Sequence, residues 1–455
     1  MARDLAGLIE LLRRGPVPAA RVAAGLGVSR ATLSRLVRAA SGVVRIGQAR
    51  ATSYALEREI RTFGTRWPIY RVGADGRAWH AANLHALEPR AWWYEPIGQR
   101  PAWLVGEHAN GLFPDLPWFL DDLRPQGFMG RAFARRHAEG LGLSPDPRLW
   151  DASGVLVALL LFGDDLPGDF VVGDAALGRV QRASLSPPAA IALADRAAHY
   201  SQLALAALHG EVPGSSAAGE QPKFTACVLE ASGNLRHVLV KFSPVCDSPS
   251  GQRWADLLVC EHLAAEVLRE HQVAACSTEV LEGGGRRFLE VTRFDRVGAF
   301  GRVGFVTLLP LDATYYGKLD SWAAAADRLE RDGWLDSEEA TRMRLLWWFG
   351  GLIGNSDMHF GNLSLTLDSR PFRLAPAYDM LPMIYRPEAG GEVVTRQPFA
   401  PPLPTPPQLP VWRRAASLAA LFWQRVADDT RVSTGMRAEA VRVLESTRML
   451  RDRFG

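Results

Sequence analysis

The most informative stretch of this sequence is Gly354-Asn-Ser-Asp-Met-His-Phe-Gly-Asn-Leu-Ser-Leu365, followed by Ala375-Pro-Ala-Tyr-Asp-Met380. Asp357 stands five positions before Asn362, and Asp379 follows an alternating apolar run, so a polar loop and a strand are predicted. This set suits a magnesium-assisted phosphoryl transfer, in which one carboxylate accepts a proton while an amide and a second carboxylate hold the metal. It also suits a plain polar loop between a helix and a hairpin, because Asn, Asp and Gly are common in turns.

The composition indicates a soluble globular protein of two or three domains, with 455 residues, 47% of them hydrophobic and 22% charged. The four cysteines form no Cys-x-x-Cys pair, which favours free thiols in a reduced cytoplasm over a zinc site. The longest apolar runs, Val155 to Phe162 and Leu345 to Ile353, are too short to span a bilayer, so no membrane association is expected.

Residues 1–60 are predicted to form a winged helix-turn-helix DNA-binding domain. Ten arginines against four acidic residues give this segment a charge of +6 within a chain of net +3. Helices are expected at residues 4–14, 18–25 and 30–40, with Ser29 as an N-cap, and strands at 43–46 and 51–56. A three-helix protein-interaction or dimerisation module is the alternative. The candidate DNA contacts lie on the third helix and beside the wing: Arg30, Thr32, Ser34, Arg35, Arg38, Arg45 and Arg50.

Residues 61–190 are rich in tryptophan, proline and glycine, and they are predicted to form a small mixed subdomain with an aromatic core. No catalytic set stands out in this segment.

Lysine is rare, with only Lys223, Lys241 and Lys318 in the whole chain, and two of these lie upstream of the Asp357 loop. The small-residue loop 214–223 could let backbone N–H groups approach phosphate oxygens, although a hairpin entry explains it about as well. Lys241 ends a predicted strand, and Glu261 follows in a predicted helix, as in kinases that orient a lysine toward nucleotide phosphates. A surface lysine and an exposed glutamate are the alternative.

Together these segments resemble the HipA family of bacterial serine/threonine kinase toxins. The matching motifs are Ser216-Ala-Ala-Gly-Glu-Gln-Pro-Lys223, Val238-Leu-Val-Lys241-Phe, Val291-Thr-Arg-Phe-Asp-Arg296, Asn355-Ser-Asp-Met-His-Phe-Gly-Asn362 and Ala377-Tyr-Asp379, with a weaker likeness at Leu116-Pro-Trp-Phe-Leu-Asp-Asp-Leu-Arg-Pro125. The resemblance implies an α+β fold: the winged helix-turn-helix, a HipA-like N-terminal subdomain at 61–190, and a two-lobed kinase core at 191–455 with a mostly helical C-lobe. The nucleotide and catalytic loops would fall at 214–380, and two amphipathic helices, at 415–428 and 434–451, would close the chain.

The resemblance also implies the roles of the site residues. Asp357 would be the catalytic base, with Asn362 and Asp379 as ligands of Mg²⁺. ATP would be held by Lys241, oriented by Glu261, under a loop that contributes Ser216, Gly219, Gln221 and Lys223. Ser216 would be the serine at which the enzyme phosphorylates itself, and His359 would be structural.

Two departures from the family pattern stand out. The segment expected to carry the adenine hinge reads Thr307-Leu-Leu-Pro-Leu-Asp312, which leaves nucleotide preference open. The DNA-binding domain is fused to the kinase instead of residing in a separate antitoxin, as in the single-gene, YjjJ-like subgroup. The protein substrate is not named by any residue; by resemblance it would be a translation factor or an aminoacyl-tRNA synthetase. Reading of a palindromic DNA site would favour a homodimer.

The leading hypothesis is therefore a HipA-like toxin, an ATP- and Mg²⁺-dependent protein kinase with a DNA-binding head. A transcriptional regulator with a catalytically silent, nucleotide-sensing body is the second. A metal-dependent nuclease is the third, although it would leave Lys241 and the small-residue loop without a role.

Overall fold

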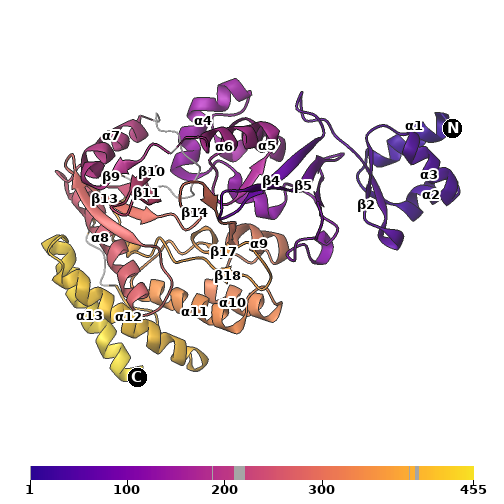
Figure 1. The fold of residues 1–455 in the computed structure, drawn as a ribbon. Helices are drawn as coiled ribbons and strands as arrows, with labels where there is room; N and C mark the ends of the chain where they lie inside the picture. The colour runs from indigo at the N-terminus through magenta and orange to yellow at the C-terminus, as the bar shows by residue number, and fades with distance from the viewer. Residues whose placement is uncertain (1, 187, 210–220, 389, 395–398, 455) are drawn as a thin grey trace.

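The computed structural model describes residues 2–186, 188–209, 221–388, 390–394 and 399–454, without the side chains of Ala2 and Arg50. The N-terminal residues form a small head set apart from a larger body, and the last two helices lie at the opposite end of that body (Figure 1). None of the helices in the described ranges is both long enough and apolar enough to cross a membrane.

The head consists of three helices and a three-stranded antiparallel sheet of order β1-β3-β2. Its elements are α1 (Ala2–Leu12), β1 (Val17–Pro18), α2 (Ala19–Leu26), α3 (Arg30–Ala39), β2 (Val43–Ile46) and β3 (Ser53–Leu56). The predicted cap is present, since Ser29 Oγ accepts a hydrogen bond from Thr32 N at 3.2 Å. Leu33 and Leu36 of α3 are buried, whereas Val37 is only half-buried.

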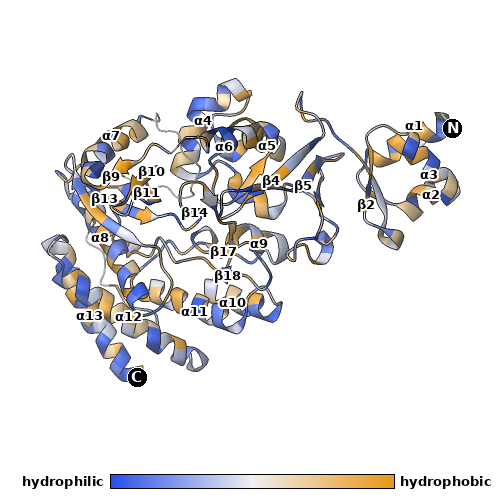
Figure 2. Cartoon of the chain, in the orientation of Figure 1, coloured by the Kyte–Doolittle hydropathy of each residue, from blue (hydrophilic) through white to orange (hydrophobic). Residues whose placement is uncertain are grey.

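The middle of the chain forms a five-stranded antiparallel sheet of order β7-β6-β5-β4-β8, packed with three helices. Its elements are β4 (Arg66–Val72), β5 (Ala78–Ala86), β6 (Trp92–Pro96), β7 (Leu112–Phe113), α4 (Gly127–Leu141), α5 (Ala152–Phe162), β8 (Phe170–Val172) and α6 (Asp174–Ala183). Most of the tryptophans fill its core as expected, namely Trp92, Trp103, Trp118 and Trp150, whereas Trp93 is buried against Ile46 and Ala55 of the head. β4 and α5 carry many apolar residues that are buried, and both elements are coloured mainly as hydrophobic in Figure 2.

A second five-stranded sheet, of order β12-β13-β11-β10-β9, packs with two helices. These elements are β9 (Ile191–Ala192), α7 (Arg196–Leu208), β10 (Lys223–Leu229), β11 (Leu235–Phe242), α8 (Pro249–Glu270), β12 (Thr278–Gly283) and β13 (Arg286–Thr292). On one side of the sheet, Tyr200 of α7 packs with Phe224, Phe242 and Phe288 from the strands. α8 is buried on most of its surface, and β11 lies between β10 and β13.

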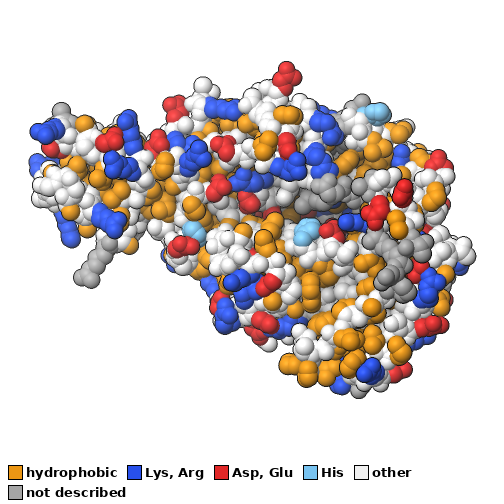
Figure 3. Space-filling view, turned by 180° about the vertical axis from the view of Figure 1, so that it is seen from behind, with side chains coloured by type: hydrophobic (Ala, Val, Ile, Leu, Met, Phe, Trp, Pro, Cys, Tyr) orange, Lys and Arg blue, Asp and Glu red, His pale blue; other side chains and the backbone are white. Residues whose placement is uncertain are grey.

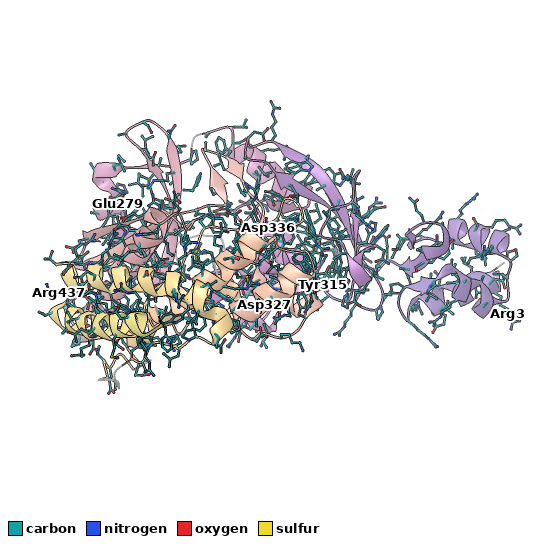
Figure 4. The ribbon with its side chains drawn as sticks, turned by 90° about the horizontal axis from the view of Figure 1, so that it is seen from below. Arg3, Glu279, Tyr315, Asp327, Asp336 and Arg437 are labelled. Atoms are coloured by element: carbon teal, nitrogen blue, oxygen red, sulfur yellow. The ribbon has the colours of Figure 1, made fainter. Side chains whose placement is uncertain are left out.

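The remainder is mostly helical. Its strands are β14 (Arg296–Val297), β15 (Gly301–Arg302), β16 (Phe305–Thr307), β17 (Ser364–Thr366) and β18 (Arg373–Leu374), and its helices are α9 (Leu308–Tyr315), α10 (Trp322–Arg331), α11 (Ser337–Leu352), α12 (Leu409–Asp428) and α13 (Thr434–Phe454). Seen from below, α12 and α13 lie side by side under the body, at the end away from Arg3 of the head (Figure 4).

Candidate active site

The predicted pairing of Lys241 with Glu261 is present and buried. Lys241 ends β11, and its ammonium lies 2.6 and 2.7 Å from the two carboxylate oxygens of Glu261 on α8. Both side chains are only 4% exposed. Burial alone would lower the pKa of Lys241, but the carboxylates of Asp379 and Glu261 outweigh it and raise the pKa. The ammonium is therefore a permanent charge held in one position.

A second lysine and a carboxylate complete this charged group. Lys223 is buried on β10, directly across the strand pair from Lys241. Asp379 forms an ion pair with Lys241. Burial would raise the pKa of Asp379, but the charges of Lys241 and Lys223 hold it below its usual value. Asp379 thus remains an anion, as a metal ligand must.

Two asparagine side chains bring the three residues of the opening motif together. Asn355 donates to the carbonyl of Asp379 at 3.0 Å and accepts from the backbone N–H of Asp357, also at 3.0 Å. Asn362 donates its Nδ2 to the carbonyl of Asp357 at 2.8 Å, and among the described residues no donor contacts its amide oxygen, which could act as a ligand. Asp379 has a φ of 55°, in the left-handed region that non-glycine residues rarely adopt. The loop is therefore built to hold Asp357, Asn362 and Asp379 in one arrangement.

A cavity of about 140 Å³ lies over this group, and both polar and apolar side chains line it. Lys223, Lys241, Asn362 and Asp379 supply charged and polar atoms. The apolar lining comes from Leu239, Cys276, Val291, Phe294 and Phe305. The space-filling view from behind shows a groove across the body (Figure 3). A ligand that carries both an anionic group and a flat apolar group matches this lining.

Comparisons with known proteins agree with the motifs. Residues 63–181 match the family model described as YjjJ-like toxin, middle domain, and residues 215–448 match the HipA-like C-terminal domain. Toxin YjjJ of Escherichia coli (strain K12) is 40% identical over 449 residues, which cover 98% of each chain.

This chain belongs to the HipA family of toxins.

The HipA-like fold is also found in a solved HipA structure, and a second structure gives a lower similarity score. A chain from the Shewanella oneidensis MR-1 complex of HipA, HipB and operator DNA superposes with a TM-score of 0.51 at 13% identity, covering 85% of this chain and 97% of that one. The Helicobacter pylori proinflammatory kinase CtkA gives a TM-score of 0.34 at 14% identity, covering 51% of this chain and 89% of that one.

The structure does not place the other predicted nucleotide contacts of this HipA-family chain in the cavity lining. Ser216 and Gly219 lie outside the described residues. Gln221 is half-buried but is not among the described residues that line the cavity. His359 Nδ1 accepts a hydrogen bond from Gly361 N at 3.0 Å within the loop, and the structural role expected for it stays a prediction.

The structure corrects the assignment of residues 307–312 to the hinge. Leu308 begins α9, and Leu308, Leu311 and Asp312 are buried against neighbouring elements. Only Thr307 of this segment lines the cavity, whereas Thr292, the last residue of β13, and Arg293, Phe294 and Asp295 directly after it all line the cavity. The strand order explains the difference, because β13 pairs with β11 and delivers its C-terminal end to the cavity. In the sequence, the motif from Val291 to Arg296 could have indicated this part of the cavity wall.

The proposed DNA contacts are mostly on the surface of the head. Arg30, Arg35 and Arg38 of α3 are exposed, as is Arg45 on β2. Thr32 and Ser34 are half-buried, and Thr32 shares a hydrogen bond with Ser29 at 3.0 Å. The side chain of Arg50 is outside the described part of the structure. Basic side chains are visible over the head in Figure 3.

Proposed function

We propose that this HipA-family toxin is an ATP- and Mg²⁺-dependent protein serine/threonine kinase that phosphorylates itself at Ser216. The observation that carries the proposal is one cavity that gathers Lys241, Asn362 and Asp379, with Asn362 bonded to the backbone carbonyl of Asp357, which lies beside the cavity lining and not in it. These are the side chains that phosphoryl transfer requires, because its catalysis is mainly positioning and charge neutralisation.

Each side chain has a distinct task in this proposal. Lys241, fixed by Glu261, would bind phosphate oxygens, and Lys223 would add a second positive charge on the neighbouring strand. Asp357 would accept the proton of the attacking hydroxyl. Asn362 and Asp379 offer an amide oxygen and a carboxylate, the oxygen ligands that Mg²⁺ prefers, and the metal would neutralise phosphate charge.

The nuclease alternative receives less support. Within the described ranges, no three His, Cys, Asp or Glu side chains are grouped so that they could hold a metal ion. A site built from one amide, one carboxylate and two lysines instead relies on the phosphates of a nucleotide to complete the metal's coordination.

The head supports a second part of the proposal, binding of DNA by residues 1–60 as a winged helix-turn-helix. The HipA structure from Shewanella oneidensis MR-1 is a complex with HipB and operator DNA. In the present chain the three helices, the three-stranded sheet and the exposed arginines of α3 form a basic unit attached to the body. A palindromic operator would be bound by two copies, and the kinase substrate would be a protein of the translation machinery.

The kinase proposal is tested by incubating the protein with labelled ATP and Mg²⁺. We expect label on Ser216 that is lost in Asp357→Asn and retained in Asp368→Asn, which changes an exposed carboxylate in the turn after β17. ATP binding without any label in the wild-type protein would favour the silent regulator. DNA cleavage that needs no ATP would favour the nuclease.

A further inference from the structure

One wall of the nucleotide cavity comes from residues 61–190, a segment in which the sequence shows no catalytic set. Asp122, Gln126 and Pro167 all line the cavity. Asp122 lies in the 3-10 turn Trp118–Leu123 and reaches Thr307 of β16. Its Oδ2 accepts from Thr307 N at 2.5 Å and its Oδ1 from Thr307 Oγ1 at 2.8 Å.

Within the described part of the chain, Asp122 differs from the other carboxylates of this cavity in having no cation paired with it. Asp295 is paired with Arg293 and Arg296, and Asp379 with Lys241. Among the residues that the structure describes, Asp122 makes no ion pair. Burial raises its pKa to about 6, against the two hydrogen bonds from Thr307. An uncompensated carboxylate costs folding stability, and such groups are concentrated at functional sites.

The position of Asp122 is at the aromatic part of the cavity. Its partner Thr307 is two residues after Phe305, whose ring centroid lies 5.0 Å from that of Phe294. Phe294 in turn stacks on Tyr378 with centroids 6.0 Å apart. Burial raises the pKa of Tyr378, and the charges of Asp379 and Asp122 raise it further. Asp122 is therefore a hydrogen-bond acceptor beside flat apolar side chains.

We propose that Asp122 is a specificity residue that accepts a hydrogen bond from the bound nucleoside. A carboxylate oxygen that already accepts one bond has capacity for another, so both Asp122 oxygens remain usable. The matching donors on a nucleoside are the ribose hydroxyls and an exocyclic amino group of the base. This inference rests on the proposed function, since it assumes that the cavity holds a nucleotide.

The alternative is that Asp122 only fastens the middle of the chain to β16. Asp122→Asn separates the two roles, because the amide can keep both Thr307 contacts: its oxygen accepts from the backbone N–H, and its nitrogen donates to the hydroxyl oxygen. The variant loses the negative charge and half of the acceptor capacity. Asp121→Asn is the matched control, since the neighbouring Asp121 pairs with Arg124 and does not line this cavity.

The experiment measures dissociation constants of the full-length protein for ATP with Mg²⁺ by calorimetry. We expect Asp122→Asn to weaken ATP binding roughly tenfold to a hundredfold, the range for hydrogen bonds to charged groups, and Asp121→Asn to leave it unchanged. Three analogues locate the donor: 2′-deoxy-ATP, 3′-deoxy-ATP and purine riboside triphosphate. The one that lacks the donor should bind the wild type weakly and lose little more in Asp122→Asn.

Thr307→Val is the second variant, because it removes the hydroxyl bond and leaves the carboxylate. Because Thr307 itself lines the cavity, the deciding readout is discrimination: Thr307→Val should still bind ATP more tightly than the analogue that lacks the donor, whereas equal binding of the two indicates a fastening role and overturns the proposal. Unchanged ATP affinity in Asp122→Asn also overturns it. If the wild-type protein binds no nucleotide, the proposed function fails first, so the two failures are distinguishable.

Discussion

At the scale of single residues, the site depends on charges that fix one another in place. Lys241 is held by two carboxylates from different parts of the chain, Glu261 on α8 and Asp379 after β18. Removal of one carboxylate leaves the ammonium charged but able to move. A substitution of Glu261 is therefore expected to disturb the position of the Lys241 ammonium while its charge remains.

Glu261→Gln is expected to lower autophosphorylation roughly tenfold to a hundredfold, because a small displacement of Lys241 misaligns the phosphates. The rate of label incorporation at saturating ATP measures this loss. Glu266→Gln, one turn further along α8 and partly exposed, is the control and should behave as wild type. Equal rates for both variants would show that Asp379 alone suffices to position Lys241.

Asp122 gives a pH-dependent prediction for stability. Its pKa in the folded protein is raised to about 6 from the ordinary 3.8, mainly by burial and partly by Asp121. The folded state therefore binds this proton more tightly than the unfolded state, so the cost of the carboxylate is present above pH 6 and disappears as pH falls toward 4. Asp122→Asn should be more stable than wild type at pH 7.5, with the difference shrinking at pH 5. Urea unfolding at the two pH values measures it. A variant less stable than wild type at pH 7.5 would contradict the assigned cost.

At the scale of elements, features that depend on neighbouring residues were predicted well, whereas the pairing of strands was not. The Ser29 cap, the start of α3 and the bounds of β2 follow from neighbouring residues, and the structure has them. Pro18 was assigned to a helix, but its backbone is extended (ψ 138°) and it pairs in β1, so α2 begins at Ala19. α12 was expected from residue 415 and begins at Leu409, because Pro410 is tolerated in a first helical turn.

The hinge error has the same origin. Residues 307–312 were placed by their distance along the chain from a motif, whereas the cavity wall is decided by which strands pair. Asn355 and Asp122 were missed for a related reason. Their roles depend on contacts with Asp379 and Thr307, which lie 24 and 185 positions away.

The exposed arginines of α3 make the DNA proposal testable at the level of this helix. Arg35→Ala combined with Arg38→Ala should weaken DNA binding and reduce its dependence on salt, because two phosphate contacts are lost. Filter binding to fragments of the protein's own promoter region at several salt concentrations measures both effects. Arg448→Ala with Arg451→Ala on α13 removes the same charge at the far end of the molecule and is the control. Equal salt slopes for the two double variants would refute the placement of α3 on DNA.

At the scale of the whole molecule, the three parts of the chain are joined by specific polar contacts. Between the head and the middle sheet, the buried His85 contacts Glu57 at 2.8 Å and Glu95 at 3.2 Å. Between the middle and the cavity, Arg296 bonds Asp295 at 2.7 Å and Asp165 at 3.0 Å, and Gly168 N donates to Asp295 at 2.9 Å. The cavity is thus assembled from parts that are distant in sequence, which no local pattern reveals.

Arg296 joins the middle of the chain to the wall of the cavity, because it contacts Asp165, Leu166 and Gly168 as well as Asp295. Its side chain is 5% exposed and its partner Asp295 is 7% exposed. Burial alone would raise the pKa of Asp295, but Arg293 and Arg296 hold it well below its usual range. Arg296→Met leaves Asp295 with one cation and releases the carbonyls of Leu166 and Gly168.

The expected result of Arg296→Met is a loss of about 3–5 kcal/mol in the free energy of unfolding, the usual cost of breaking a buried pair from one side. Because Asp295 and Pro167 line the cavity, ATP affinity should fall as well, at protein concentrations and temperatures where the variant is still folded. Urea unfolding and calorimetry of ATP binding measure the two effects, with the exposed Arg373→Met as control. A variant that loses stability but binds ATP as wild type would show that the middle of the chain supports the fold without shaping the cavity.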